Sequence, residues 1–161
     1  MSGSAFDISS KEFPFKEMGI HDFAADLAFG HVGEDYVRRF LLAITTGDYE
    51  VKTDRYRNGR MVIETNQNPR GMVDSENNRM WVPSGINVTT AKWWVYVFSL
   101  DGAFIMLDVD RVKRYLRLNR DKFNESTKIN LGSLDNPARG FLLYPNHVSD
   151  LMVNPDYDAE E

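Results

Sequence analysis

The feature that most constrains the fold is an almost entirely apolar and aromatic segment, residues 94–100, in the middle of the chain. A strand with one face in water alternates apolar and polar side chains, so this segment predicts a strand in the centre of a sheet. Asp101 and Gly102 follow, a pair that favours a tight turn. Residues 103–107 are again apolar and predict the antiparallel partner of the central strand.

Apolar periodicity predicts helices on both sides of this hairpin. Residues 22–44 carry apolar side chains at a spacing near 3.6, with Gly30 and Gly33 as an expected break. Residues 109–120 predict a basic helix whose inward side chains are Val112, Tyr115 and Leu116. A third, short helix is expected near residues 148–152.

The remaining segments predict further strands, turns and loops. Residues 48–55 and 60–65 are expected to form a hairpin, because Asn58-Gly59 supplies the positive φ of a tight turn. Residues 66–82 and 121–139 are polar and predict loops. A short helix capped by Thr89 or Thr90 is expected to run into residues 91–93, and residues 140–145 predict a last strand. This α–β–β–α–β–β–α order predicts an α/β fold, with one mixed β-sheet flanked by helices.

The chain length of 161 residues is enough for one domain with a sizeable core. We expect an N-terminal arm (residues 1–21), a domain (residues 22–153) and an acidic tail (residues 154–161). Without cysteine, disulfides and thiolate zinc sites are excluded. The sequence contains neither an apolar run of membrane-spanning length nor a signal-peptide pattern, so we expect a cytoplasmic protein without membrane contact.

Charged side chains alternate along the first predicted strand. Because alternate residues on a strand share a face, Asp48, Glu50 and Lys52 should line one face while Tyr49 and Val51 point into a core. Two carboxylates beside an ammonium suit a divalent-metal site with a positive charge next to it. Such a site can hydrolyse a phosphodiester: the metal activates water, and the lysine stabilises the developing negative charge.

Several motifs together resemble a known family. The stretches that carry the resemblance, in order, are residues 26–30 (DLAFG), 33–34 (GE), 49–55 (YEVKTDR), 58–64 (NGRMVIE), 84–86 (SGI), 89–91 (TTA) and 93–97 (WWVYV). In order and spacing they resemble the PD-(D/E)XK nuclease superfamily, in particular a small branch encoded largely by phages and their hosts. The resemblance implies a restriction-endonuclease-like fold and a location in the host cytoplasm if the gene is phage-borne.

The resemblance also implies an activity and a set of site residues. It implies a Mg²⁺-dependent DNA endonuclease, with Mn²⁺ as a substitute, directed to DNA structure more than to sequence. Glu50 and Lys52 match the Glu-x-Lys half of the signature and would be catalytic, while Glu34 matches a helix-borne acid found in many members. The metal ligands would then be Glu34, Asp48 and Glu50. A homodimer is compatible with the resemblance.

Two questions stay open at this point. The signature's early aspartate is missing, so either Asp48 or Glu64 could complete the metal site, or the fold could be a catalytically silent module that binds DNA or protein. The candidates for DNA contact are Arg55, Arg57 and Arg60, which follow the Glu-x-Lys strand, together with Ser84 and Lys92. Residues 111–128 form a second basic segment. The net charge of −5 argues mildly against indiscriminate binding to nucleic acid.

Overall fold

The structure is a computed structural model. It describes residues 23–54, 56–99, 102–123, 128–132 and 135–158. The chain divides into two compact units, Met1–Gly47 and Asp48–Glu161, here called the first and second unit. The expected arm, residues 1–21, lies outside the described residues, as do Arg55 and the last three residues. The helices and strands are α1 (Phe23–Thr46), β1 (Tyr49–Thr53), β2 (Met61–Gln67), β3 (Val82–Pro83), β4 (Trp93–Ser99), β5 (Ala103–Asp108), α2 (Val109–Leu118), β6 (Lys128–Gly132), β7 (Pro137–Leu143) and α3 (Pro145–Val153).

The first unit contributes α1, which runs without interruption through Gly30 and Gly33. The expected break at these glycines is therefore wrong. A glycine inside a helix costs about 1 kcal/mol relative to alanine, which weakens a helix but does not by itself end it. A Cβ added at either position would meet nothing within 4 Å, so neither glycine serves a close approach.

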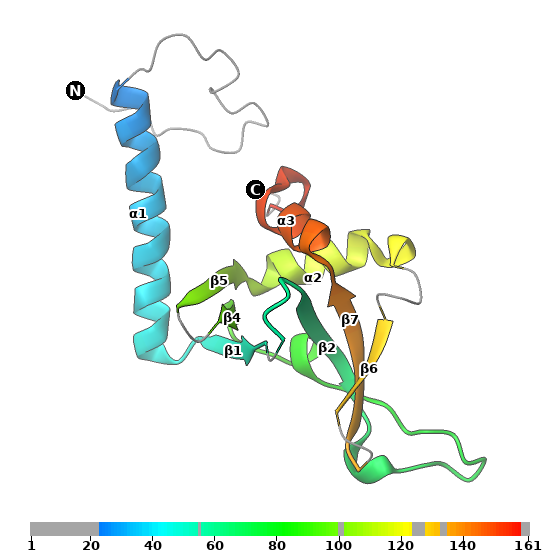
Figure 1. Cartoon of the computed structure of the whole chain (residues 1–161). Coiled ribbons are helices and arrows are strands. Elements are labelled where there is room, and N and C mark those ends of the chain that lie inside the picture. The colour runs from blue at the N-terminus through cyan, green and yellow to red at the C-terminus, as the bar shows by residue number, and fades with distance from the viewer. Residues whose placement is uncertain (1–22, 55, 100–101, 124–127, 133–134, 159–161) are drawn as a thin grey trace. The chain divides into compact units, whose positions relative to one another are not determined.

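The predicted central hairpin is confirmed in the second unit. β4 is the middle strand of a three-stranded sheet, and β5 pairs with it in the antiparallel sense (Figure 1). Leu100 and Asp101 of the turn lie outside the described residues, while Gly102 has a φ of +106°, which suits glycine. β1 pairs with the other side of β4 in parallel, so this sheet is mixed.

The expected hairpin between residues 48–55 and 60–65 is wrong. β2 belongs to a second sheet, in the order β3-β2-β7-β6, and pairs with β3 and β7 instead of β1. The turn at Gly59 does form, with a φ of +71°, but it directs the chain into the other sheet. The single mixed sheet expected from the sequence is therefore two small sheets.

Two strands of the second sheet differ from the sequence prediction. β6 lies in a segment expected to be a loop, and β7 begins at Pro137, earlier than expected. β7 carries Gly140, where a Cβ would collide with the backbone carbonyl of Ile63 on β2. Glycine is thus required at this point for β7 and β2 to approach each other.

Both sheets and two helices of the second unit share one core. The hydroxyl of Tyr96 on β4 accepts a hydrogen bond of 3.1 Å from the backbone N–H of Val62 on β2, which connects the two sheets. Trp94 is fully buried, as expected for the central strand. The buried cluster comprises Met61, Ile63, Ile86, Trp94, Tyr96, Leu107, Val109, Val112, Tyr115, Leu116, Phe123, Leu143, Val148, Leu151 and Tyr157.

The basic helix is confirmed as α2, and the short C-terminal helix as α3. The carboxylate of Asp108 caps α2 by accepting hydrogen bonds from the N–H groups of Asp110 and Arg111. Val112, Tyr115 and Leu116 are buried, as predicted. The helix expected to run into residues 91–93 is wrong, because the only helical turn nearby in the described chain is a 3₁₀ helix at Gly85–Asn87.

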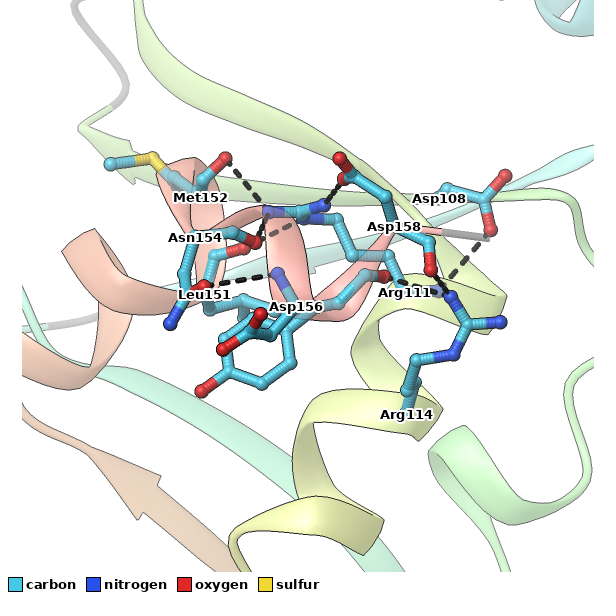
Figure 2. Close-up of polar contacts among 9 residues, drawn as sticks. Asp108, Arg111, Arg114, Leu151, Met152, Asn154, Asp156 and Asp158 are labelled. Atoms are coloured by element: carbon cyan, nitrogen blue, oxygen red, sulfur yellow. Dashed lines mark hydrogen bonds and ion pairs between the residues drawn. The ribbon is translucent and has the colours of Figure 1, made fainter. Parts of the chain in front are cut away.

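The last turn of α3 and the segment that follows it are held against α2 by two arginines (Figure 2). Arg111 donates to the carbonyl oxygens of Leu151, Met152 and Asn154, at 2.7, 3.2 and 2.8 Å, and forms an ion pair with Asp158. Arg114 donates to the carbonyl oxygens of two further residues of the segment, Tyr157 and Asp158.

The described part of the chain has a mixed α/β architecture. Among its helices, none has the length and apolar character needed to cross a membrane.

Candidate functional site

Glu50 and Lys52 lie on the face of the mixed sheet that is directed toward the core. In the parallel register, Glu50 is opposite Trp94 and Lys52 is opposite Tyr96, and residues side by side in neighbouring strands project to the same face. The Lys52 ammonium lies 5.4 Å from the centroid of the Trp94 ring. The two charged side chains therefore share a face, as predicted.

The prediction for the opposite face of β1 is wrong. Tyr49 and Val51 are 37% and 48% exposed, so they do not enter the core. β1 has one hydrogen-bonded neighbour among the described strands, β4, and its alternation is inverted relative to the expectation. Trp94 and Tyr96, beside Glu50 and Lys52, belong to the buried cluster of the core, whereas Trp93 and Val95, beside Tyr49 and Val51, are buried but are not members of that cluster.

The carboxylate of Glu50 is held in its ionised form. Burial acts most strongly on it and alone would raise its pKa, but hydrogen bonds from Lys52 and Thr89 and the charge of Lys52 together outweigh burial, so the pKa lies below its ordinary value. The ion pair is short, with Lys52 Nζ 2.6 Å from Glu50 Oε1. From the sequence, Thr89 was considered as a helix cap and as part of the motif at residues 89–91, and its spacing gave no sign of this contact.

Asp48 connects the start of β1 to the start of β4. Its Oδ1 accepts a hydrogen bond of 2.6 Å from the backbone N–H of Lys92, and its carbonyl oxygen accepts one of 3.2 Å from Trp93. Lys92, a candidate for DNA contact, forms an ion pair through its ammonium with Asp108. Asp48 and Glu50 thus each have a partner within the fold.

Glu64 and Ser84 form a pair in the other sheet. Glu64 is on β2, and the Ser84 hydroxyl donates a hydrogen bond of 2.5 Å to its Oε1. Since β1 and β2 are not paired, Glu64 does not reach Glu50 across a hairpin, and the basis on which it was considered as a metal ligand is wrong. Ser84, a candidate for phosphate contact, is buried.

Glu34 is on α1, in the first unit. Its side chain is exposed, and Oε2 lies 3.3 Å from Nδ1 of His31, one turn earlier. This contact is typical of a solvent-facing pair on a helix.

The basic residues that follow β1 are exposed. Arg57 adopts a positive φ of 48°, and the Arg60 guanidinium lies 4.9 Å from the centroid of the Tyr144 ring, a cation–π contact. Arg55 lies outside the described residues. Arg57 and Arg60 are thus accessible to a phosphate backbone.

The carboxylates of Asp48 and Glu50 are oxygen donors of the kind that binds Mg²⁺. Within the described ranges, no three or more side chains of His, Cys, Asp or Glu are grouped so that they could hold a metal ion. Mg²⁺ prefers oxygen donors and is commonly bound by one or two carboxylates, with water and substrate phosphate as its other ligands. Asp48 and Glu50 are the residues of the second unit that would hold it.

The residues of this candidate site are thus Asp48, Glu50, Lys52 and Thr89, all in the second unit. No protein-family model, curated protein or solved structure matches this chain.

Proposed function

We propose that this chain is a Mg²⁺-dependent endonuclease that hydrolyses phosphodiester bonds in DNA, on a variant of the restriction-endonuclease-like fold. The observation that supports this most directly is the contact between Glu50 and Lys52 on β1, 2.6 Å apart. An ionised carboxylate can coordinate a metal ion, and the adjacent ammonium can bind a phosphate oxygen. The ordered motifs that surround this pair in the sequence support the same activity.

Each residue of the pair has a separate role in the proposed reaction. Bound Mg²⁺ would supply Lewis-acid stabilisation of the phosphoryl oxygens and a more acidic water molecule. Glu50, with Asp48, provides the carboxylate oxygens of the site. Lys52 has three N–H donors, so it can donate to Glu50 and to a phosphate oxygen at the same time, where negative charge increases in the transition state.

DNA contact is assigned to the exposed cations that follow β1. Arg57 and Arg60 are exposed in the turn between β1 and β2 and can bind phosphates of the DNA backbone. Contacts to phosphates carry no sequence information by themselves, so we infer recognition of DNA structure, such as branches, more than of a base sequence.

A second candidate, a DNA- or protein-binding module without catalysis, is favoured by a specific observation. The carboxylates of Asp48, Glu50 and Glu64 each have a partner within the fold: the Lys92 backbone, Lys52 and Ser84, respectively. The same contacts would simply fasten β1 to β4 and β2 to its neighbouring turn.

The experiment that separates the two candidates is nicking of supercoiled plasmid and of branched DNA with Mg²⁺, Mn²⁺ or EDTA. We expect metal-dependent nicking by the wild type and a loss of about 10²-fold or more in Glu50→Gln, which keeps the size of the side chain. Glu76→Gln, in an exposed turn away from β1, is the matched control and should nick at the wild-type rate.

Each result has a defined meaning. DNA binding without nicking by the wild type would favour the module. Nicking that survives in Glu50→Gln would exclude the proposed site.

A further inference from the structure

A second candidate site lies in the second unit, and none of its described lining residues belongs to β1. It is a cavity of about 340 Å³, within the range of roughly 300–1,000 Å³ typical of small-ligand pockets. It is formed by β2, the 3₁₀ helix at Gly85–Asn87, α2 and β7. The described lining residues are Thr65, Asn66, Ile86, Asn87, Lys113, Leu116, Arg117, Arg120 and Phe141.

The charged residues among the described lining of this pocket are all basic. Lys113, Arg117 and Arg120 are spaced four and three residues apart, so they follow one face of α2 and its continuation. Among the described residues that line the pocket, none is acidic. All three cations are exposed, and none forms an ion pair with a described carboxylate.

Two other arginines on the same helix have a structural role, because they hold the C-terminal segment through hydrogen bonds. Arg111 and Arg114 donate to carbonyl oxygens of the C-terminal segment (Figure 2). The pocket cations have no such contacts in the described structure. Favourable interaction with the helix C-terminus accounts for Arg117 and Arg120, but Lys113 lies a full turn earlier. Like charges four residues apart repel each other, and a bound anion would remove that repulsion.

The rest of the pocket suits a planar group attached to the anion. Ile86 and Leu116 are buried and form an apolar floor. The ring of Phe141 is half-buried, and its centroid lies 5.0 Å from that of Phe123, which supports it from the core. At the rim, Asn87 donates from Nδ2 to the carbonyl oxygen of Thr65 at 2.9 Å, and this bond fixes the orientation of its amide.

We propose that this pocket binds a nucleotide, with the phosphate against Lys113, Arg117 and Arg120 and the base against Phe141. The ligand chemistry is the same for a free nucleotide and for one nucleotide of a nucleic-acid strand, so the test contains an arm for each. The proposal goes beyond the proposed nuclease activity and does not depend on it, because neither Glu50 nor Lys52 lines the pocket.

The test measures binding in EDTA, so that cleavage plays no part. One arm titrates the full chain with AMP by calorimetry, and the other titrates it with a labelled single-stranded deoxyoligonucleotide by fluorescence anisotropy. We expect Lys113→Gln and Arg117→Gln each to weaken binding about tenfold, the size expected for one lost hydrogen bond to a charged group. Lys122→Gln removes the same charge from an exposed position outside the pocket and should bind as the wild type does.

A further variant tests the base contact. Phe141→Leu should reduce the preference for AMP over inorganic phosphate, because phosphate has no base to contact the ring. Thermal melting followed by circular dichroism confirms that each variant is folded. Since Lys113 is exposed in the middle of α2, its variant keeps the test valid even if Phe141→Leu is unstable.

The outcomes are distinct. Binding of AMP identifies a free nucleotide as sufficient, and binding of the oligonucleotide alone identifies a strand. The proposal is overturned if neither probe binds at low salt, or if Lys113→Gln and Arg117→Gln bind as tightly as Lys122→Gln does.

Discussion

The ammonium of Lys52 lies 2.6 Å from Oε1 of Glu50, although one residue separates them along β1. Alternate residues on a strand are about 7 Å apart along the backbone, so the two side chains must lean toward each other to form this contact. The pair lies on the core-facing side of the sheet beside Trp94, where water screens it only in part.

We predict that this pair makes stability depend on acid pH. The pKa of Glu50 is lowered in the folded chain, so its contribution is present above the ordinary pKa of a glutamate, about 4.3, and is lost as pH falls through the lower folded value. Urea unfolding at about pH 6 and about pH 3 should therefore show a smaller acid-induced loss in Glu50→Gln than in the wild type. Thr89→Val removes one of the hydrogen bonds to Glu50, so its acid-induced loss of stability should lie between those of Glu50→Gln and the wild type. Equal losses in all three proteins would contradict the assignment.

Lys52→Ala should lower turnover far more than DNA affinity. One cation among many adds little to binding, whereas a charge beside the phosphate in the transition state can contribute about 10²-fold or more in rate. Single-turnover cleavage and anisotropy on the same DNA measure the two quantities. Weaker binding with unchanged turnover would make Lys52 a phosphate anchor only.

Arg111→Met should destabilise the second unit by about 2–4 kcal/mol. The substitution keeps much of the side-chain volume but leaves three carbonyl oxygens and Asp158 without their donor. Arg117→Met on the same helix is the control, because Arg117 is exposed and has no described ion pair. Equilibrium unfolding in urea gives both values, and a similar change in the two variants would show that the C-terminal segment is not fastened by Arg111.

Alkaline pH should destabilise the second unit through its buried tyrosines. Burial first, then the charges of Asp150 and Tyr157, raise the pKa of Tyr115 far above its ordinary value. Because the folded pKa is raised, the contribution of neutral Tyr115 to stability is fully present below about pH 10, the ordinary tyrosine pKa. That contribution is lost as pH rises toward the folded value.

Tyr115→Phe removes this ionisation and should lose less stability than the wild type between about pH 8 and about pH 11. Tyr96 and Tyr157 also have raised pKa values, so part of the alkaline loss will remain. The measurement is the urea midpoint at each pH. A steeper alkaline loss in the variant would contradict the prediction.

The elements that the sequence predicted correctly depend on local signals. The β4–β5 hairpin follows from two apolar segments and the turn between them. α2 follows from the spacing of Val112, Tyr115 and Leu116, which are buried as that spacing requires. Each of these patterns is contained within about 15 residues, so neighbouring residues alone specify it.

The errors concern pairing between distant segments. Tyr49 pairs with Trp93, a partner 44 positions later, and no turn signal marks that pairing. The Asn58-Gly59 turn is real, but a turn signal shows only that the chain reverses and does not show which strand it pairs with. β6 was missed because residues 121–139 are mostly polar and its pairing with β7 is established only in the sheet.

The candidate site was predicted in part for the same reason. That Glu50 and Lys52 share a face follows from strand alternation and is confirmed. Which face they occupy depends on the neighbour of β1, and the presence of Tyr49 and Val51 suggested the opposite answer. The contact from Thr89 to Glu50 depends on tertiary structure alone.

The position of β1 has a consequence for the behaviour of the protein in concentrated solution. Among the described strands, β1 pairs with β4 alone and so forms a sheet edge, where unpaired N–H and C=O groups can accept a strand from another copy. Charged side chains directed inward from an edge strand hinder such addition, because a new strand would bury them. Glu50 and Lys52 have this placement. We therefore expect the pair to hinder edge-to-edge association between copies, whatever chemistry it performs.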